Sequence, residues 1–337
     1  MNLKSKLVLV VLAAALSVGA AHAQQPIPIK FSHVVAENTP KGKGALKFKE
    51  LAEQKTGGRV KVDVYPNSSL YKDREEMEAL QIGSVHMLAP SVSKFGPLGV
   101  RQFEVFDLPY MFPDKATLYA VTDGPIGQGL LKMLEPKGIV GLAYWDNGFK
   151  QMSANKPLRS VESFSGLKMR IQSSKVLEGQ MKQLGAIPQS MAFSEVYTAL
   201  QQGVVDGTEN PWSNMYTQKM HEVQKHATVS DHGLVAYAVI VNKKWWDGLP
   251  PDIHKALAAA MAEATKYERD IAQKENDDAF EKIKAAKTTE IYVLPAAERL
   301  VWQKAMLPLH QQYESVVGKD TIQAIYKTAQ DVAKAKK

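Results

Sequence analysis

The sequence predicts an α/β fold of two domains with mixed, mostly parallel sheets. A chain of 337 residues is long enough for about two domains that each bury a core. Between residues 27 and 89, strand patterns alternate with amphipathic helix patterns, which is typical of parallel strands joined by helices. The alternation resumes after residue 147, and a helix pattern from 251 to 288 then exceeds the width of one domain.

The first unit opens with a strand pattern from Ile27 to Val35. A helix follows, because Thr39 can cap it, Pro40 suits its first position, and Gly57-Gly58 can end it. The remaining predicted elements are a strand from Arg59 to Tyr65, a helix from about Asp73 to Gln81, an apolar run from Val85 to Ala89, a helix from Thr117 to Leu134 and a strand from Ile139 to Trp145.

Asp146-Asn147-Gly148 is a turn signal that separates the two units. The second unit is predicted to contain a strand from Phe149 to Ala154, a strand that includes Arg170, a helix ending at Leu184, a helix from Ser194 to Gln202 and an extended segment from Val204 to Asn210. A strand from Tyr237 to Val241 would return the chain to the first unit.

The pattern from Pro251 to Thr288 has no internal proline or glycine, and its apolar stripe lapses between Glu275 and Asp278. One interpretation is two helices with a break near Asn276. We favour a single bent helix, about 55 Å long, that lies along both domains. A last helix from Ala296 to Glu314 and the lysine-rich end should be structural.

The N-terminus has the pattern of a cleaved secretory signal. Lys4 and Lys6 precede an uncharged apolar stretch from Leu7 to Ala20, and Ala21-His22-Ala23 suits cleavage after Ala23. The stretch is too short to span a bilayer core of about 30 Å. We therefore expect export to the periplasm.

Charge and cysteine content narrow the possible functions. Removing residues 1–23 removes two of the 42 basic residues and none of the 35 acidic residues, which leaves a net charge of +5. This charge is spread along the chain, so nucleic-acid binding is not indicated. The absence of cysteine excludes disulfides, thiol chemistry and lipid attachment through cysteine.

Catalytic and cofactor motifs are not recognisable. His221-Glu222 begins a zinc motif, but position 225 is lysine instead of histidine. Gly42 and Gly44 begin a dinucleotide-binding motif, but the third position is Lys47. We expect no cofactor, no metal and no enzymatic activity. A rival hypothesis is a periplasmic hydrolase or isomerase that uses Glu209 and Lys150 as acid and base.

Arg170 is the first candidate for ligand binding. Its strand is followed by Ser174, a plausible helix cap, so Arg170 should lie where a strand ends and a helix begins. This is where α/β proteins hold ligands, and the planar guanidinium matches a carboxylate. A surface arginine in a salt bridge is the alternative.

Further side chains could complete an anion site. Lys41 and Lys43 lie in the first turn of a predicted helix, where cations oppose the helix dipole unless an anion is bound. Lys150 follows the turn signal, and Asn210 is held extended by Pro211. Other possible contacts are Trp212, Tyr237, Phe149 and His33, although residues of these types more often belong to the core.

Several motifs together resemble a known family. These are T-P-K-G-K-G at 39–44, W-D-N-G-F-K-Q-M at 145–152, G-L-K-M-R-I-Q at 166–172, the block from Phe193 to Pro211, and the long helix after P-P-D-I. At these spacings the mature chain resembles the DctP-type periplasmic solute-binding proteins of tripartite ATP-independent periplasmic (TRAP) transporters.

The resemblance implies a periplasmic-binding-protein-like fold with hinge strands and a long helix that bridges the domains. The expected domains are 24–146 with about 236–270, and 147–235 with about 271–330, and the ligand cleft lies between them. The resemblance also implies closure over one organic anion and delivery to sodium-driven membrane permease subunits. We expect a monomer.

The resemblance also assigns residues. The family's carboxylate-gripping arginine falls on Arg170 and its asparagine on Asn210. Its second basic residue, often arginine, falls on Lys150, and an N-terminal basic contact falls on Lys41 or Lys43. The motif at 145–152 resembles the C4-dicarboxylate branch (succinate, fumarate, malate). Another carboxylate, such as a keto, hydroxy, sugar or aromatic acid, and a ligand-sensing role beside a membrane receptor remain alternatives.

Overall fold

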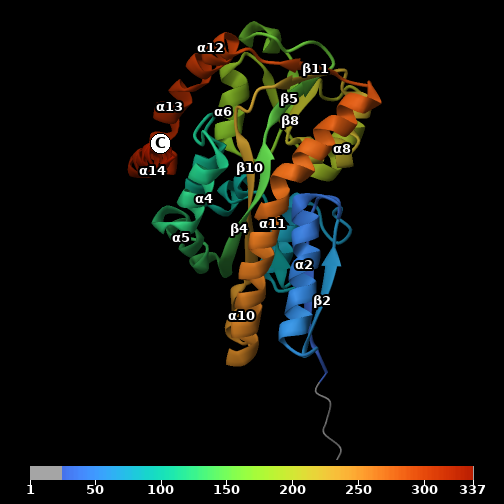
Figure 1. The fold of residues 1–337 in the computed structure, drawn as a ribbon, viewed down its shortest axis with the longest axis vertical. Coiled ribbons are helices and arrows are strands. Elements are labelled where there is room, and N and C mark those ends of the chain that lie inside the picture. Colours follow the sequence, from blue (N-terminus) through green and yellow to red (C-terminus); the bar gives the residue numbers. More distant parts are fainter. Residues whose placement is uncertain (1–24, 337) are drawn as a thin grey trace, which may run out of the picture.

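Two β-sheets with helices packed against them form the computed structural model, which describes residues 25–336 (Figure 1). The predicted signal at 1–23 lies outside the described residues. Within this part of the chain, no helix has both the length and the apolar character needed to cross a membrane.

The first sheet has the strand order β2-β1-β3-β10-β4. Its strands are β1 (Ile27–Ser32), β2 (Val60–Tyr65), β3 (Met87–Leu88), β4 (Ile139–Phe149) and β10 (Leu234–Asn242). Strand β1 is parallel to β2 and β3, whereas β10 is antiparallel to β3 and β4. The predicted return strand is therefore β10, which begins three residues earlier than expected and brings the chain back to the first sheet.

The second sheet has the order β11-β9-β5-β8-β6-β7. Its strands are β5 (Gln151–Ala154), β6 (Lys168–Ile171), β7 (Ile187–Ser190), β8 (Gly207–Asn210), β9 (His226–Val229) and β11 (Glu290–Val293). Strand β6 is parallel to β7 and β8, and β5 is antiparallel to β8 and β9. Strand β11 is parallel to β9, so five of the nine strand pairs of the described residues are parallel and four antiparallel. The sheets are mixed, as predicted, with a small excess of parallel pairs.

Helix α2 (Pro40–Lys55) begins where the local sequence predicted it. The Thr39 side chain accepts a hydrogen bond from the Gly42 N–H, and Pro40 occupies the first helical position. The other α-helices are α3 (Asp73–Gln81), α4 (Lys115–Asp123), α5 (Pro125–Lys132), α6 (Lys175–Gln183), α7 (Val196–Gln201), α8 (Trp212–Thr217), α9 (Met220–Val223), α10 (Lys243–Asp247), α11 (Pro251–Ala286), α12 (Ala296–Met306), α13 (Pro308–Val317) and α14 (Lys319–Ala335).

Two predicted helices are each divided in two. The pattern from 117 to 134 forms α4 and α5, because Gly124 interrupts it and Pro125 starts a new helix. The pattern from 296 to 314 forms α12 and α13, which are divided at Pro308. In both cases a proline, which lacks the N–H that would continue the first helix, begins the second.

The turn predicted at Asp146-Asn147-Gly148 is wrong. Strand β4 continues through these residues, and Phe149 still pairs with Leu234 of β10. Contacts from distant residues replace the turn: the Asp146 N–H donates to Glu268, and the Asn147 carbonyl accepts from Asn276. The chain thus crosses from the first sheet to the second within β4, with a bulge at 147–148 where Gly148 has a φ of +98° and its N–H donates to the Asp146 side chain.

Helix α11 is a single helix of 36 residues, which confirms the interpretation we favoured. In Figure 1 it runs from α10 at the bottom to β11 at the top, alongside both sheets. The chain passes between the sheets near 150 and again between β9 and β10. These crossings lie close to the predicted domain limits at 146 and 236, and the limits themselves remain a prediction.

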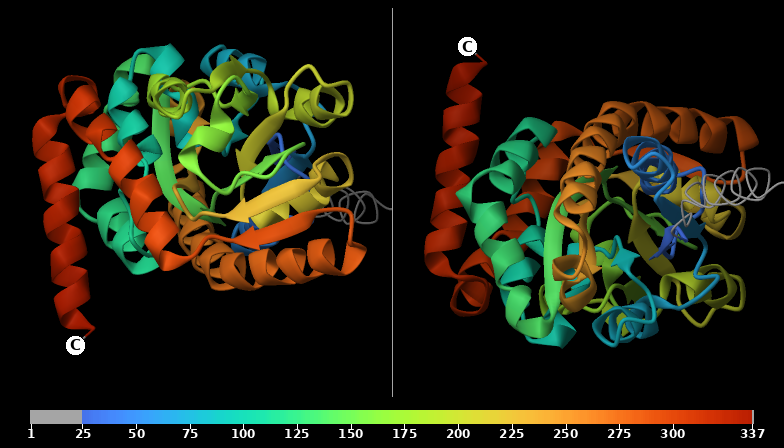
Figure 2. Two further views of the ribbon diagram at one scale, coloured as in Figure 1. Left: turned by 90° about the horizontal axis from the view of Figure 1, so that it is seen from above. Right: turned by 90° about the horizontal axis from the view of Figure 1, so that it is seen from below.

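The cores follow from this arrangement. One apolar cluster lies between the first sheet and helices α2 and α11, and includes Phe31, Trp145 and Leu257. A second covers the opposite face with α4 and α14, which pack side by side at the edge of the molecule (Figure 2). A third packs α6 and α12 on the second sheet around Trp302. Helices on both faces leave the strand ends as the place for a ligand.

Candidate functional site

A small cavity lies where the two sheets approach each other. About 300 Å³ inside it is free of protein atoms, a volume that includes space open to solvent. The first sheet and its connections contribute Asp73, Ser91, Lys94 and Tyr237, and the second contributes Arg170, Gln172, Phe193, Asn210 and Asn214. The sequence therefore brings polar groups from segments far apart into one enclosed space.

Arg170 lies near the end of β6, and only 2% of it is exposed. Ser174 caps the next helix by accepting from the Leu177 N–H, so the predicted strand-to-helix geometry is confirmed. The Nε and Nη2 groups donate to the Met191 carbonyl at 3.2 and 2.9 Å. Burial lowers the pKa of Arg170, although a guanidinium keeps its charge at any ordinary pH.

No carboxylate within residues 25–336 forms a direct ion pair with Arg170. Among the described residues, Met191 is its hydrogen-bond acceptor, and Asp73, Glu209 and Glu195 act on it only through longer-range attraction. The Phe193 ring lies against it, with its centroid 5.8 Å from the guanidinium carbon. A buried cation with unused donors favours an anionic ligand.

Lys94 is a second buried cation at the cavity, and sequence reasoning missed it. Its Nζ lies 2.5 Å from Asp73 and 3.3 Å from Glu76. Burial opposes its charge, but the two carboxylates outweigh burial and raise the pKa of Lys94. The sequence feature that could have identified Lys94 is a single lysine in the mainly apolar segment that follows β3. Such a lysine is also common at a protein surface, so this feature alone does not indicate a binding site.

Amide and hydroxyl groups complete the cavity wall. Asn210 ends β8, and its Oδ1 accepts a hydrogen bond of 3.3 Å from Asn214 Nδ2. The Tyr237 hydroxyl lies beside the Asn214 side chain, and within the described part of the chain neither this hydroxyl nor Asn214 Oδ1 has a hydrogen bond of normal geometry. Burial raises the pKa of the Tyr237 hydroxyl, which keeps it protonated as a donor. Unpaired buried polar atoms at a cavity indicate that a ligand or water completes them.

Lys41 and His33 lie behind this wall instead of lining the cavity. Lys41 Nζ is 3.8 Å from the Tyr237 ring centroid and donates to the Ala89 carbonyl at 2.9 Å. Burial, followed by repulsion from Lys94, lowers the pKa of Lys41 to about 7. Burial, followed by Lys41, lowers the pKa of His33 to about 3, so its imidazole is neutral.

The structure does not bring Lys43, Lys150 or Trp212 to the cavity. Lys43 forms an ion pair of 2.6 Å with Glu275 of α11. Lys150 forms one of 2.6 Å with Glu209, whose other oxygen contacts His232 and Gln180. Trp212 packs on Phe280, with ring centroids 5.1 Å apart, and Phe149 packs beside the core of the first sheet.

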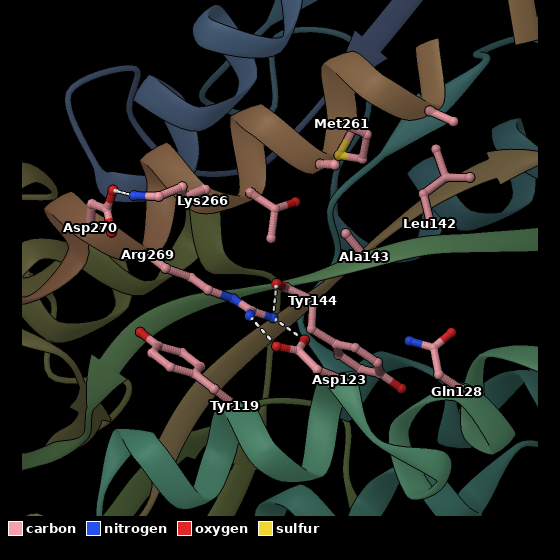
Figure 3. Close-up of a pocket in the computed structure, with 13 residues that line it drawn as sticks. Tyr119, Asp123, Gln128, Leu142, Ala143, Tyr144, Met261, Lys266, Arg269 and Asp270 are labelled. Atoms are coloured by element: carbon pink, nitrogen blue, oxygen red, sulfur yellow. Dashed lines mark hydrogen bonds and ion pairs between the residues drawn. The ribbon is translucent and has the colours of Figure 1, made fainter. Parts of the chain in front are cut away.

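A larger open hollow lies elsewhere, between α4, α5, β4 and α11 (Figure 3). Its cations are already paired: Arg269 donates to both carboxylate oxygens of Asp123, and Lys266 contacts Asp270. None of the predicted site residues lines it. The described residues also contain no group of three or more side chains suited to holding a metal.

Residues 31–316 match the family described as bacterial extracellular solute-binding protein, family 7. The chain belongs to this family. This family-7 chain is 64% identical over 301 residues to the C4-dicarboxylate-binding periplasmic protein DctP of Rhodobacter capsulatus, covering 89% of this chain and 90% of the relative.

Solved structures of TRAP periplasmic solute-binding proteins agree with the fold. One from Shewanella oneidensis with bound succinate is 44% identical, has a TM-score of 0.88, and covers 90% of this chain and 99% of that chain. One from Pseudomonas aeruginosa with bound L-malate is 43% identical, has a TM-score of 0.84, and covers 86% and 100% of the two chains. The two-domain periplasmic-binding fold predicted for this family-7 protein is thereby confirmed.

Proposed function

We propose that this chain is the periplasmic solute-binding protein of a TRAP transporter. It captures a C4-dicarboxylate (succinate, fumarate or malate) by domain closure and delivers it to a sodium-driven membrane permease. The observation that carries the proposal is the buried Arg170, which no carboxylate of the described residues pairs directly, at one small cavity beside Lys94. The names and bound ligands of the relatives support the same class of ligand.

Two carboxylates need two cationic partners. A pair between Arg170 and one carboxylate is worth about 4 kcal/mol at an effective dielectric of about 20, which alone corresponds to roughly millimolar binding. The planar guanidinium can donate two parallel hydrogen bonds to that carboxylate. Lys94, which pairs with Asp73 and Glu76, would reach the second carboxylate by exchanging one of these partners. Tyr237 would donate a hydrogen bond between them, and Asn210 would do so once its Nδ2 turns away from Thr208 and Met220.

The burial of the proposed ligand-binding residues implies that the two domains open and close. Arg170 and Asn210 are 2% and 4% exposed, so a ligand has little access to them in this arrangement. The strands that cross between the sheets and helix α11 are the elements that must bend to admit it. Closure then excludes water, which strengthens each ionic contact.

The buried Glu209–Lys150 pair supports a role without catalysis. In the rival hypothesis these residues are the acid and base, yet they bind each other at 2.6 Å and do not line the cavity. Mass spectrometry of a ligand before and after incubation tests this point. Recovery of a chemically altered acid would favour the enzyme.

The experiment that tests the function combines two measurements. Native mass spectrometry should identify the small acid that co-purifies with the protein. Titration calorimetry should then show tight binding of succinate, malate or fumarate and weak binding of keto, sugar and aromatic acids. Tight binding of one of the latter instead would redirect the proposal to another carboxylate.

Partner, location and assembly are proposed with the function. Permease subunits should bind the closed form, whereas capture of a receptor kinase by that form would favour the sensing role. The mass of the mature protein recovered from the periplasm should correspond to cleavage after Ala23. Sedimentation should show a monomer.

A further inference from the structure

The buried stripe of α11 contains two polar residues among apolar ones. Glu268 is fully buried, and Asn276 is 5% exposed. The other buried positions of the helix are Ile253, Leu257, Ala260, Met261, Ala264, Ala272, Ala279 and Ile283. Asn276 lies where the apolar pattern of the sequence lapses. A polar residue on a buried helical face carries a desolvation cost that specific hydrogen bonds must offset.

Asn276 is bonded on both sides of its amide. Its Nδ2 donates to the Asn147 carbonyl at 2.9 Å, and its Oδ1 accepts from the Ser213 N–H at 3.1 Å. Gly148 has a φ of +98°, and a Cβ there would lie 2.8 Å from Asn276 Nδ2. The crossing strand therefore approaches α11 in a way that only glycine allows.

Glu268 binds Asp146, the residue that precedes Asn147 in β4. Its Oε2 accepts a hydrogen bond of 3.0 Å from the Asp146 N–H. Consecutive backbone groups of β4, at the point where the chain leaves the first sheet, are thus bonded to α11.

A short chain of contacts joins Asn276 to the cavity. Ser213 lies in the first turn of α8, and the next residue, Asn214, donates to Asn210 at 3.3 Å. Asn210 and Asn214 both line the cavity with Arg170. Asn276 does not line the cavity. It binds the first turn of α8, the helix that contributes Asn214 to the cavity wall.

We propose that Asn276 is a positioning residue for ligand binding. It ties the crossing strand and the start of α8 to the bridging helix, and so holds Asn210 and Asn214 in the closed arrangement. This inference rests on the proposed function, because it concerns the same site. Loss of these bonds lowers the population of the closed form and reduces the apparent affinity in proportion.

Succinate titration of Asn276→Leu in the full mature protein tests the inference. Leucine has a similar size but can form neither hydrogen bond, so the dissociation constant should rise at least 10-fold. Stopped-flow measurements should place most of this change in faster ligand release. Small-angle X-ray scattering should show a smaller succinate-induced compaction than in the wild type.

Two further variants separate positioning from general stability. Leu257→Ala, on the same buried stripe but in the core of the first sheet, should lower the melting temperature and leave the dissociation constant within twofold. Asn276→Asp keeps an acceptor for the Ser213 N–H but sets an oxygen against the Asn147 and Ala272 carbonyls, so its affinity should also fall. If Asn276→Leu does not fold, Asn276→Asp decides.

A wild-type dissociation constant and compaction in either Asn276 variant would overturn the inference. The outcome is distinct from failure of the proposed function, in which the wild type itself binds no organic acid. In that case the ligand-free scattering decides: Asn276→Leu should be more expanded than the wild type, and identical profiles would contradict the role of Asn276.

Discussion

Asp73 and Phe193 line the cavity from different sides, and the Asp73 carboxylate accepts a hydrogen bond of 2.8 Å from the Phe193 backbone N–H. The other carboxylate oxygen lies 2.5 Å from Lys94 Nζ. The Phe193 ring in turn lies against Arg170. One carboxylate thus connects the two halves of the cavity to both of its cations.

This contact predicts an acid-dependent loss of stability. Burial raises the pKa of Asp73, but Lys94 and the Phe193 N–H outweigh burial and lower it to about 2, from an ordinary value of 3.8. Because the folded-state pKa is the lower one, the ionised carboxylate stabilises the fold above about pH 4. This contribution, about 2 kcal/mol, is lost as the pH falls from 4 to 2.

Urea unfolding at pH 5 and pH 2.5 measures the loss. Asp73→Asn should show a smaller decrease in unfolding free energy between these pH values than the wild type. Asp252→Asn removes an aspartate from an exposed pair with Arg59 and should change the pH dependence little. Equal pH dependence in Asp73→Asn and the wild type would rule out this role of Asp73.

Replacing Arg170 tests the main carboxylate contact. Arg170→Ala removes the charge and both parallel donors, so the affinity for succinate should fall about 100-fold or more. Arg170→Lys keeps a charge but loses the planar geometry, and should bind with intermediate affinity. Calorimetry measures both, and an unchanged binding curve for Arg170→Ala would exclude the carboxylate contact.

Replacing Lys94 tests how a dicarboxylate is distinguished from a monocarboxylate. Lys94→Gln should weaken succinate binding by about 10- to 100-fold, because the second carboxylate loses its charged partner. Butyrate, which has one carboxylate, should lose far less. Lys43→Gln is the matched control, since Lys43 pairs with Glu275 away from the cavity. Equal losses for succinate and butyrate would contradict the assignment.

The sequence predicted the parts of the fold that depend on neighbouring residues. The cap at Thr39, the first-turn Pro40 and the position of Arg170 before Ser174 rest on residues within a few positions of each other. The helical spacing of apolar residues also predicted α11, including its continuation past Asn276, where this spacing is interrupted. These signals survive folding because the interactions that produce them are local.

The errors arose where distant residues decide the conformation. The turn signal at Asp146 was overridden by Glu268, which is 122 positions away in the sequence. Lys94 became a candidate only when the fold placed it beside the same cavity as Arg170. The partner of Lys150, Glu209, is 59 positions away, and no local pattern identifies it. Such pairings depend on strand order, which the hydrophobic pattern does not specify.

Lys150 should matter first for stability. Lys150→Met leaves the Glu209 carboxylate buried without its cation, and breaking a buried pair in this way costs about 3–5 kcal/mol. Burial raises the pKa of Glu209 and Lys150 helps to lower it, so removing the lysine takes away part of what keeps this buried carboxylate ionised. The double variant Lys150→Met/Glu209→Gln removes both charges and should recover much of the lost stability. Urea unfolding of the wild type, both single variants and the double variant measures the coupling, and additive effects of the two substitutions would show that the pair contributes no coupling to stability.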